Sequence, residues 1–407
     1  MMVNFTKIDF LPNLRATVRS MAIQFVDSFL ECFVGSRLLV MTKTNMCKKF
    51  FTILFLFSLT ACGMFGKVDH FESRQLTFSQ LNGWEAEDYQ QALETFKKSC
   101  SILARTPRSE TSGSSIKISQ NLWVSLCDDA QGAITAPQAK AFFERRFVPY
   151  RVANNGIENG LFTGYYEPVL YGSLHKKGDF KYPLYAAPPE LPSSKPFFTH
   201  EEINKGALNG RGLEIMWVDD PVMIFFMQIQ GSGRVRLAGG REIRLGYADG
   251  NGQPYVSLGK IMGDEGYLNK DTINFFTIRE WLYKHPQQAR SLMQRNPSYV
   301  FFKVIDKPEV VGSIAAPLTP KRSIAIDSAY IPYGLPVYME TTLPTQGGNV
   351  PFRRIMVAQD TGGAIRSPVR ADVFFGAGSE AEYLAGYMKG RGVYSILVPR
   401  EIISQMR

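Results

Sequence analysis

The sequence predicts a mainly β protein with helices at its N-terminal side. Apolar residues recur every three or four positions between Tyr89 and Leu103, which is the period of a helix. After Tyr150 the pattern changes to short alternating apolar runs separated by Gly and Pro, as in strands joined by turns. The 407 residues suffice for two or three domains, each with its own core. We therefore expect a helical entry followed by two β-rich units.

Residues 46–62 have the composition of an export signal. Two lysines precede a short apolar run, 50–59, which is too short to span a membrane as a helix. The stretch that ends in Cys62 resembles the lipobox of bacterial lipoproteins, whose cysteine is acylated; such chains would anchor the protein to a bilayer. Gly63 follows where Asp could stand, which by the sorting rule of such lipoproteins implies the periplasmic face of the outer membrane. A buried core strand is the alternative interpretation. We treat residues 1–61 as an N-terminal extension and signal peptide.

The polar residues 62–83 show no clear period and predict a membrane tether. Helical patterns then dominate residues 84–168: the stripe from Tyr89, a second one over 118–126, and a third that begins at the helix-start signal 135–137.

The clearest β signal is a hairpin. Residues 234–237 and 242–245 alternate in polarity on either side of Gly239-Gly240. Further strands are predicted at 222–230, which looks more buried, and at 323–327 and 355–359. A single helical stretch, 277–294, interrupts them. With a boundary near Asn296, the second unit covers residues 169–295 and the third covers 296–407.

Charge and composition exclude several classes of function. The net charge of +9 lies partly in the first 61 residues, and the remaining basic residues are scattered, so binding to nucleic acid is not expected. The four histidines lack ligand spacing, and neither a P-loop nor a dinucleotide fingerprint is present. We expect no metal and no cofactor.

Two cysteines of the exported part, Cys100 and Cys127, could form a disulfide, because export leads to an oxidising compartment. Two unpaired buried thiols are the alternative, since the sequence does not fix their separation.

Three aspartates stand at strand ends beside Gly or Pro: Asp327, Asp360 and Asp372. Each by itself could be a turn-capping carboxylate. Asp372, however, is followed by Val373-Phe374-Phe375, so its carboxyl could lie against apolar surface near a second carboxylate, Asp360. Both effects would raise its pKa, as a general acid requires.

Several ordered motifs from about residue 84 to the end resemble the family of membrane-bound lytic murein transglycosylase A. They are TGYYEP (163–168), QIQGSGRVRL (228–237), GYADGNGQPYVSLGK (246–260), NPSYVFF (296–302), AIDSAYIPYG (325–334), QDTGGAI (359–365) and ADVFFGAG (371–378). The last hundred residues resemble the 3D module, named for three aspartates. The resemblance implies a double-psi β-barrel built from the N-terminal and C-terminal parts, a second β-barrel inserted between them, and a groove for a glycan strand.

The resemblance also implies a reaction and roles for residues. The β-1,4 bond from N-acetylmuramic acid to N-acetylglucosamine would be cleaved without water, leaving a 1,6-anhydromuramoyl end for cell-wall turnover. Asp372 would be the acid and then the base, Asp360 a supporting carboxylate and Asp327 structural. Glu167 is not assigned a catalytic role. The substrate-binding candidates are Thr163, Gly164, Tyr165, Tyr166, Gln228, Gln230, Gly231 and Ser232, with core packing as the alternative for the two tyrosines.

Two other functions remain open at this point. The protein could be a peptidoglycan-binding lipoprotein without catalysis. Alternatively, the triplet 360–362, Asp-Thr-Gly, could belong to an aspartic protease, which would need a second such aspartate from another copy. The expected partners are glycan strands, the outer membrane through the lipid anchor, and proteins of cell-wall synthesis or remodelling.

Overall fold

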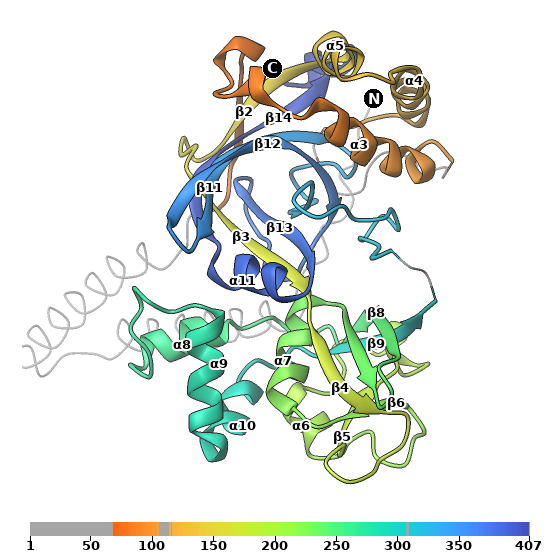
Figure 1. Ribbon diagram of the computed structural model, residues 1–407, viewed down its shortest axis with the longest axis vertical. Helices are drawn as coiled ribbons and strands as arrows, with labels where there is room; N and C mark the ends of the chain where they lie inside the picture. The colour runs from red at the N-terminus through yellow and green to blue at the C-terminus, as the bar shows by residue number, and fades with distance from the viewer. Residues whose placement is uncertain (1–67, 106–113, 115, 307–308, 407) are drawn as a thin grey trace, which may run out of the picture. The chain divides into compact units, whose positions relative to one another are not determined.

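The computed structural model describes residues 68–105, 114, 116–306 and 309–406. Within them the strands form one eight-stranded and one six-stranded sheet, and helices lie before and between the strands (Figure 1). This confirms the predicted mainly β fold with N-terminal helices. The export signal and Cys62 lie outside the described residues.

Three helices lie in the N-terminal part where the sequence predicts them: α3 (Tyr89–Leu103), α4 (Gln120–Gly132) and α5 (Ala136–Arg146). Each begins at a polar cap. The Asp88 side chain accepts a hydrogen bond from the Gln91 N–H, and Thr135 forms a capping box with Gln138. The apolar face of α3 enters the main core, where Phe96 is fully buried.

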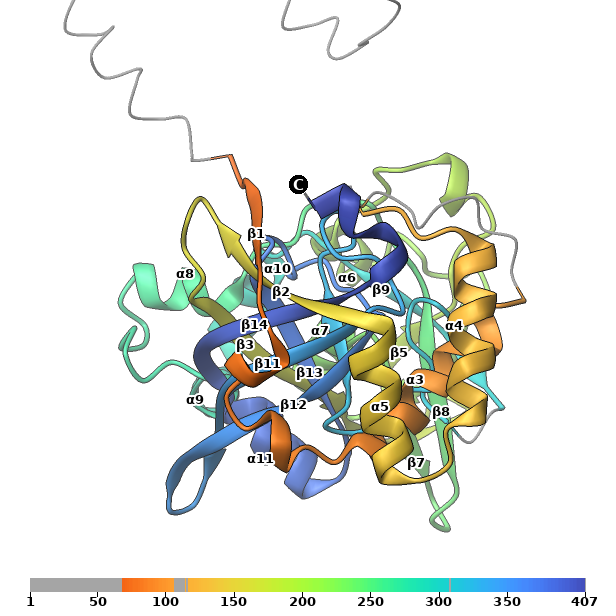
Figure 2. The same cartoon turned by 90° about the horizontal axis from the view of Figure 1, so that it is seen from above.

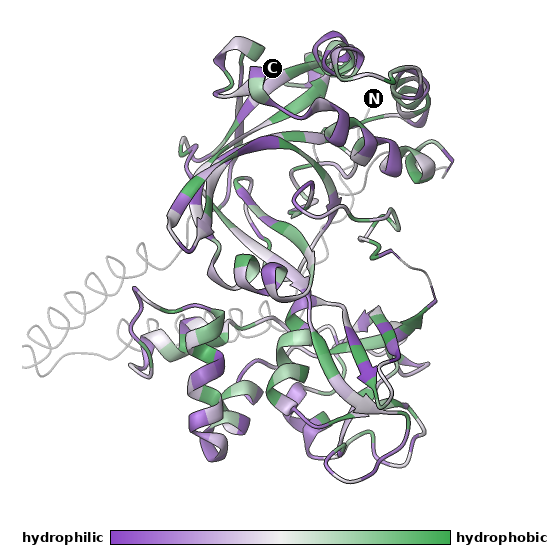
Figure 3. Ribbon diagram, viewed as in Figure 1, coloured by the Kyte–Doolittle hydropathy of each residue, from purple (hydrophilic) through white to green (hydrophobic). Residues whose placement is uncertain are grey.

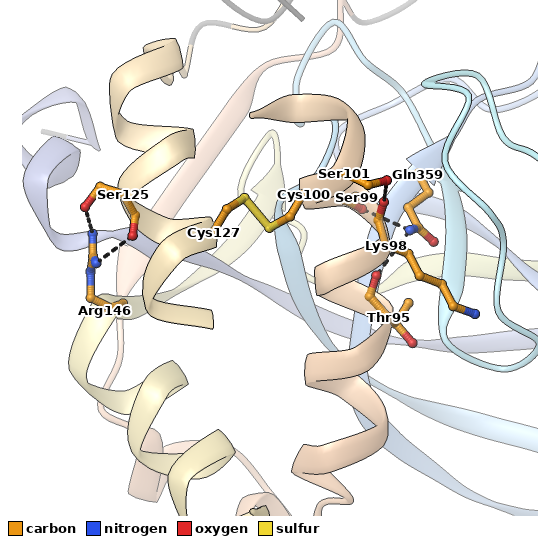
Figure 4. The surroundings of a disulfide bond; sticks show 9 residues. All are labelled: Thr95, Lys98, Ser99, Cys100, Ser101, Ser125, Cys127, Arg146 and Gln359. Carbon is orange, nitrogen blue, oxygen red and sulfur yellow. Dashed lines mark hydrogen bonds between the residues drawn. A yellow bond between two sulfur atoms is a disulfide. The ribbon is translucent and has the colours of Figure 1, made fainter. Parts of the chain in front are cut away.

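A disulfide joins Cys100 on α3 to Cys127 on α4 across 27 positions of sequence (Figure 4). Next to it, the Ser99 hydroxyl accepts a hydrogen bond from Nε2 of Gln359 at 2.9 Å. Since Asp360 follows Gln359, α3 is tied directly to the strand that ends at this aspartate.

Six strands of the eight-stranded sheet close into a barrel. The hydrogen-bonded order is β1-β2-β14-β11-β12-β10-β13-β3, and β14 also pairs with β3, which closes the ring from β14 to β3. The closure confirms the predicted barrel. Figure 2 shows β1 beside β2, its antiparallel partner. The strands are β1 (Phe71–Gln75), β2 (Phe147–Asn154), β3 (Gly160–Glu167), β10 (Ser323–Ile326), β11 (Pro336–Thr345), β12 (Gly348–Asp360), β13 (Arg370–Ala377) and β14 (Lys389–Pro399).

The six-stranded sheet has the order β5-β6-β4-β7-β8-β9. The predicted hairpin is present in it, with Arg234 opposite Arg244 and a turn through Gly239 and Gly240, both at positive φ. The strands are β4 (Val169–Ser173), β5 (Tyr182–Tyr185), β6 (Glu214–Val218), β7 (Gly233–Leu237), β8 (Glu242–Gly250) and β9 (Val300–Ile305). The helices are α6 (His200–Asn204), α7 (Pro221–Gln230), α8 (Leu258–Asp264), α9 (Phe275–Lys284), α10 (Pro286–Gln294) and, after β13, α11 (Ser379–Tyr387).

The strand predicted at 222–230 is wrong, because this segment is helix α7. Asp220 caps it by accepting hydrogen bonds from the N–H groups of Val222 and Met223, and Gly231 ends it at φ 78°. Most of α7 is hydrophobic (Figure 3), so its apolar run has no polar side that would mark the helical period. The single helix predicted at 277–294 is also wrong: Pro286 starts a second helix there.

Two predicted boundaries differ from the structure. Residues 71–75, expected in the tether, form β1, and Leu76 and Leu81 are buried in the main core. At the other boundary, β9 lies beyond Asn296 and pairs with β8, so the six-stranded sheet continues to Ile305.

Candidate active site

Two of the three aspartates lie on neighbouring strands of the barrel. Strand β10 lies between β12 and β13, and its Ala325 is the register partner of Asp360 on one side and of Asp372 on the other. On the far side of β13, Thr163 of β3 is the partner of Asp372. Four adjacent strands therefore carry the candidate site.

The Asp372 carboxylate is bound by a guanidinium and a hydroxyl group. Arg370 Nη1 lies 2.5 Å from Oδ1, and the Thr163 hydroxyl donates to the same oxygen. Arg370 Nη2 also donates to Thr163 at 2.8 Å. We expected apolar surface around this carboxyl, but its hydrogen-bond partners are polar: the Thr163 hydroxyl and Arg370, which shares its side of the strand.

Asp360 has a different set of partners, all of which donate hydrogen bonds. Its Oδ1 accepts from the N–H and the hydroxyl of Ser313, at 3.0 and 2.7 Å, and from the Thr361 N–H at 2.9 Å. Its Oδ2 accepts from the Tyr165 hydroxyl at 2.9 Å. Burial raises the pKa of the Asp360 carboxyl above its ordinary value, although these hydrogen bonds oppose the rise.

The Tyr165 phenol is affected by the charges of both aspartates. Its ring lies 5.2 Å from that of Phe374, and its hydroxyl binds Asp360. Burial raises its pKa well above the ordinary value, and the negative charges of Asp360 and Asp372 add to the rise. The phenol therefore stays protonated and can donate.

Asp327 has hydrogen-bond partners of its own and holds a turn. It is 5% exposed, and its carboxylate accepts hydrogen bonds from the N–H groups of Ala329 and Ser367, at 3.1 and 3.0 Å. Ser367 has a φ of 108°, an unusual value for a residue with a side chain, in the connection that leads into β13. These contacts favour a structural role.

Tyr166 and Gly164 pack inside the fold. Tyr166 is 4% exposed, and its hydroxyl donates to Oε1 of Glu382, which also pairs with Arg279 at 2.6 Å. Its ring is therefore not open to a sugar, which agrees with the alternative of core packing for this tyrosine. A Cβ atom on Gly164 would lie 2.4 Å from the Phe375 ring, so glycine is required for packing there.

The candidates around α7 differ in exposure. Gln228 is 6% exposed, so it is enclosed rather than presented to a ligand. Gln230 accepts a hydrogen bond from the Tyr166 backbone N–H at 2.9 Å, which connects the end of α7 to β3. Gly231 is the left-handed cap of the helix, and Ser232 is half-buried.

Glu167 is fully buried and paired with two arginines. Its carboxylate lies 2.9 Å from Arg234 Nη2 and 3.0 Å from Arg244 Nε. This ion-paired position suits a structural carboxylate.

Three further residues contact the site and were missed by the sequence analysis. Arg370 stands two positions before Asp372, and strand alternation could have placed it on the same side. Ser313 is 47 positions from Asp360, so no local signal connects them. The half-buried Tyr255 lies against Gly363: a Cβ atom there would be 3.9 Å from Tyr255 Cβ. Burial raises the pKa of Tyr255, and the charge of Asp372 adds to the rise.

In the described part of the chain, no three His, Cys, Asp or Glu side chains are grouped so that they could hold a metal ion. Among the same residues, no helix has the length and apolar character needed to cross a membrane.

Two family models match the chain. Residues 161–303 match the MltA specific insert domain, and residues 322–398 match the 3D domain. The first match contains β4 to β8 with their helices, and the second contains Asp327, Asp360 and Asp372.

Curated relatives carry one name. Membrane-bound lytic murein transglycosylase A of Vibrio cholerae serotype O1 is 34% identical over 239 residues, which cover 58% of this chain and 64% of the relative. The protein of that name from Escherichia coli K12 is 35% identical over 242 residues, with the same coverage. The chain thus spans slightly less than two thirds of the curated relatives that it matches.

Solved structures agree with this likeness. The membrane-bound lytic murein transglycosylase from Agrobacterium tumefaciens is 31% identical with a TM-score of 0.75, covering 83% of this chain and all of that one. The structure of Escherichia coli MltA with bound chitohexaose is 27% identical with a TM-score of 0.62, covering 77% of this chain and 89% of that one.

Proposed function

Because the chain belongs to the family of membrane-bound lytic murein transglycosylase A, we propose that it cleaves the β-1,4 bond between N-acetylmuramic acid and N-acetylglucosamine in peptidoglycan. The products would be glycan strands that end in 1,6-anhydromuramic acid, released during cell-wall turnover. The observation that carries the proposal is the placement of Asp372 beside Thr163 and Arg370, with Asp360, which accepts from the Tyr165 hydroxyl, on the other side of β10.

One carboxyl group suffices for this reaction. In the proposed reaction, the Asp372 carboxyl group donates a proton to the glycosidic oxygen as the bond from C1 of the muramic acid breaks. The C6 hydroxyl of the same sugar then attacks C1, and the Asp372 carboxylate takes up its proton, which restores the starting state. Because the attacking hydroxyl is tethered in the substrate, its effective concentration can far exceed that of water, so no protein nucleophile is required.

Arg370 and Thr163 suit the second half of this cycle. Both donate to Oδ1 of Asp372, and such donors stabilise the carboxylate that acts as the base. Among the described residues, the hydrogen bonds to this carboxylate reach Oδ1, and Oδ2 is the oxygen that we assign to the substrate.

Asp360 and Tyr165 support Asp372 from two different strands: Tyr165 lies on β3, which pairs with β13, and Asp360 lies on β12, on the other side of β10. The protonated hydroxyl of Tyr165 donates to Asp360, and its ring packs against Phe374. Because Tyr165 is only half-buried, its ring can also offer an edge to a sugar. The Escherichia coli relative was crystallised with chitohexaose, a chain of sugars, which supports a glycan as the substrate here. Neither a non-catalytic clamp nor an aspartic protease is favoured, because the relatives are named as transglycosylases.

For the N-terminal part we propose an export signal through residue 61 and acylation of Cys62, with a tether that leads to β1. The lipid would hold the enzyme at the periplasmic face of the outer membrane, within reach of the cell wall. The names of the relatives, which include the words membrane-bound, support this location.

Mass analysis of the products tests the proposed reaction. The purified full-length chain, kept in detergent, is incubated with peptidoglycan sacculi, and the soluble muropeptides are analysed. We expect muropeptides that are lighter by one water than the products of hydrolysis, because the anhydro ring replaces the reducing end. Products with reducing ends, or no soluble products, would contradict the proposal.

A further inference from the structure

Ser313 makes two hydrogen bonds to one oxygen of Asp360. Both its backbone N–H and its hydroxyl donate to Oδ1, at 3.0 and 2.7 Å. Together with the Thr361 N–H, three donors thus meet at Oδ1, whereas Oδ2 accepts from Tyr165. The two oxygens of this carboxyl group are therefore chemically distinct.

The loop that carries Ser313 is fixed by contacts that do not involve its side chain. A Cβ atom on Gly312 would lie 2.3 Å from the Gln359 carbonyl oxygen, so only glycine allows the loop to lie this close to β12. Ile314 and Ala316 are fully buried, and Ala315 has a φ of 64°, which is unfavourable for a residue with a Cβ atom. Such a conformation persists when the surroundings determine it.

Ser313 itself is exposed, so the fold does not need its hydroxyl for packing. The backbone N–H of Gly312 donates to the Ala316 carbonyl, and that of Leu318 donates to the Val310 carbonyl at 2.7 Å. These bonds close the loop without help from the hydroxyl group. The Ser313 hydroxyl is thus directed at Asp360 by a loop that is stable without it.

We propose that Ser313 is a positioning residue, which holds Oδ1 of Asp360 with two donors and thereby directs Oδ2 to the hydroxyl group of Tyr165. When this carboxyl is protonated, its hydrogen has to lie on Oδ2, because donors already surround Oδ1. Ser313 then determines which oxygen of Asp360 is hydrogen-bonded to the Tyr165 hydroxyl. The negative charge of Asp372 also acts on this phenol, by raising its pKa. The role of Ser313 in turnover rests on the function proposed above; its role in orienting the carboxyl does not.

Kinetics of three variants test the role in turnover. Ser313→Ala should lower kcat roughly tenfold, since the hydrogen bond from the Ser313 hydroxyl to Oδ1 is lost, with KM and Tm unchanged. Ser313→Thr keeps the hydroxyl and should restore most of kcat. Ser291→Ala is the matched control: this exposed serine on α10 also donates one hydrogen bond, at 2.9 Å to the Gln288 carbonyl. Wild-type kcat in Ser313→Ala, or an equal loss in Ser313→Thr accompanied by a lower Tm, would overturn the proposal.

A crystal structure of Ser313→Ala tests the orientation without any assay. We expect the Asp360 carboxyl to rotate and its bond to Tyr165 to lengthen or break. An unchanged carboxyl would overturn the inference whether or not the chain cleaves peptidoglycan. By contrast, a wild-type chain without anhydro products would contradict the proposed function and leave this structural test decisive for Ser313.

Discussion

Asp360 and Asp372 are register partners of the same residue, Ala325, on opposite sides of strand β10. With about 4.8 Å between neighbouring strands, their Cα atoms are roughly 10 Å apart. Their surroundings differ: Asp372 pairs with Arg370, whereas Asp360 is bound by neutral donors, Ser313, Thr361 and Tyr165. The two carboxyl groups are therefore not equivalent, and each should respond differently to substitution.

Replacing Asp372 by Asn should abolish the chemical step. The amide keeps the size of the side chain but neither donates a proton as an acid nor accepts one as a base, so we expect kcat to fall by about 10³-fold or more. The rate of release of anhydromuropeptides measures the loss, and Tm checks the fold. The matched control is Asp128→Asn at an exposed position of α4, which should keep wild-type activity. Substantial activity in Asp372→Asn would remove this residue from the mechanism.

Asp360→Asn should lower activity and, at neutral pH, raise stability. Burial raises the pKa of this carboxyl in the fold, so the folded state favours the protonated form. Its contribution is favourable below the ordinary pKa of 3.8 and is lost as the pH rises through the folded value. The neutral amide avoids this loss. In thermal melts, the Tm of the variant should lie above that of the wild type at pH 8 and close to it at pH 3.5. A Tm below that of the wild type at pH 8 would contradict the predicted stabilisation.

The sequence predicts those parts of this fold that local signals determine. The cap at Thr135 and the two glycines of the hairpin predict their elements, because each signal acts within a few residues. Helix α7 is missed, since its apolar residues surround the axis. The neighbours of Asp372 depend on how the barrel closes. Closure is decided by strand pairings between residues more than a hundred positions apart in sequence, such as the pairing of Thr163 with Asp372.

The candidate site shows the same limit. The aspartates were identified from their motifs, but their partners were not, because Ser313 approaches Asp360 through a tertiary contact. Tyr165 and Tyr166 are adjacent in sequence and point to opposite sides of β3, and only the register decides which one meets Asp360.

Asp327→Asn should reduce stability more than chemistry. Its carboxylate accepts from the N–H groups of Ala329 and Ser367, and an amide nitrogen at either oxygen position cannot accept. We expect a loss of roughly 1 to 3 kcal/mol in the free energy of unfolding, measured by urea denaturation. Below the melting temperature, kcat should fall far less than in Asp372→Asn. A stable Asp327→Asn chain with no activity would instead assign this residue to the reaction.

Removal of the disulfide should destabilise the chain without changing the products. The bridge closes a loop of 27 positions, for which the chain-entropy model predicts about 3 to 4 kcal/mol. The double variant Cys100→Ser/Cys127→Ser should therefore have a lower Tm than the oxidised wild type. A reductant should lower the Tm of the wild type towards that of the variant and leave the variant unchanged. Equal Tm values for the variant and the oxidised protein would contradict this contribution.

His200 should make the fold sensitive to mild acid. It is 4% exposed beside the rings of Phe225 and Tyr299, and burial lowers its pKa from 6.5 to about 4. Between pH 6.5 and about pH 4, the folded chain thus keeps this imidazole neutral, while the unfolded chain takes up a proton on it. Stability is complete above pH 6.5 and decreases as the pH falls towards 4, by roughly 3 kcal/mol in total. Urea denaturation from pH 7 to pH 4 measures this decrease in the free energy of unfolding.

His200→Phe, which keeps an aromatic ring among its neighbours, should flatten the slope of stability against pH, whereas the same change at the exposed His175 should leave it as in the wild type. An equally steep slope in His200→Phe would show that other groups cause the acid sensitivity.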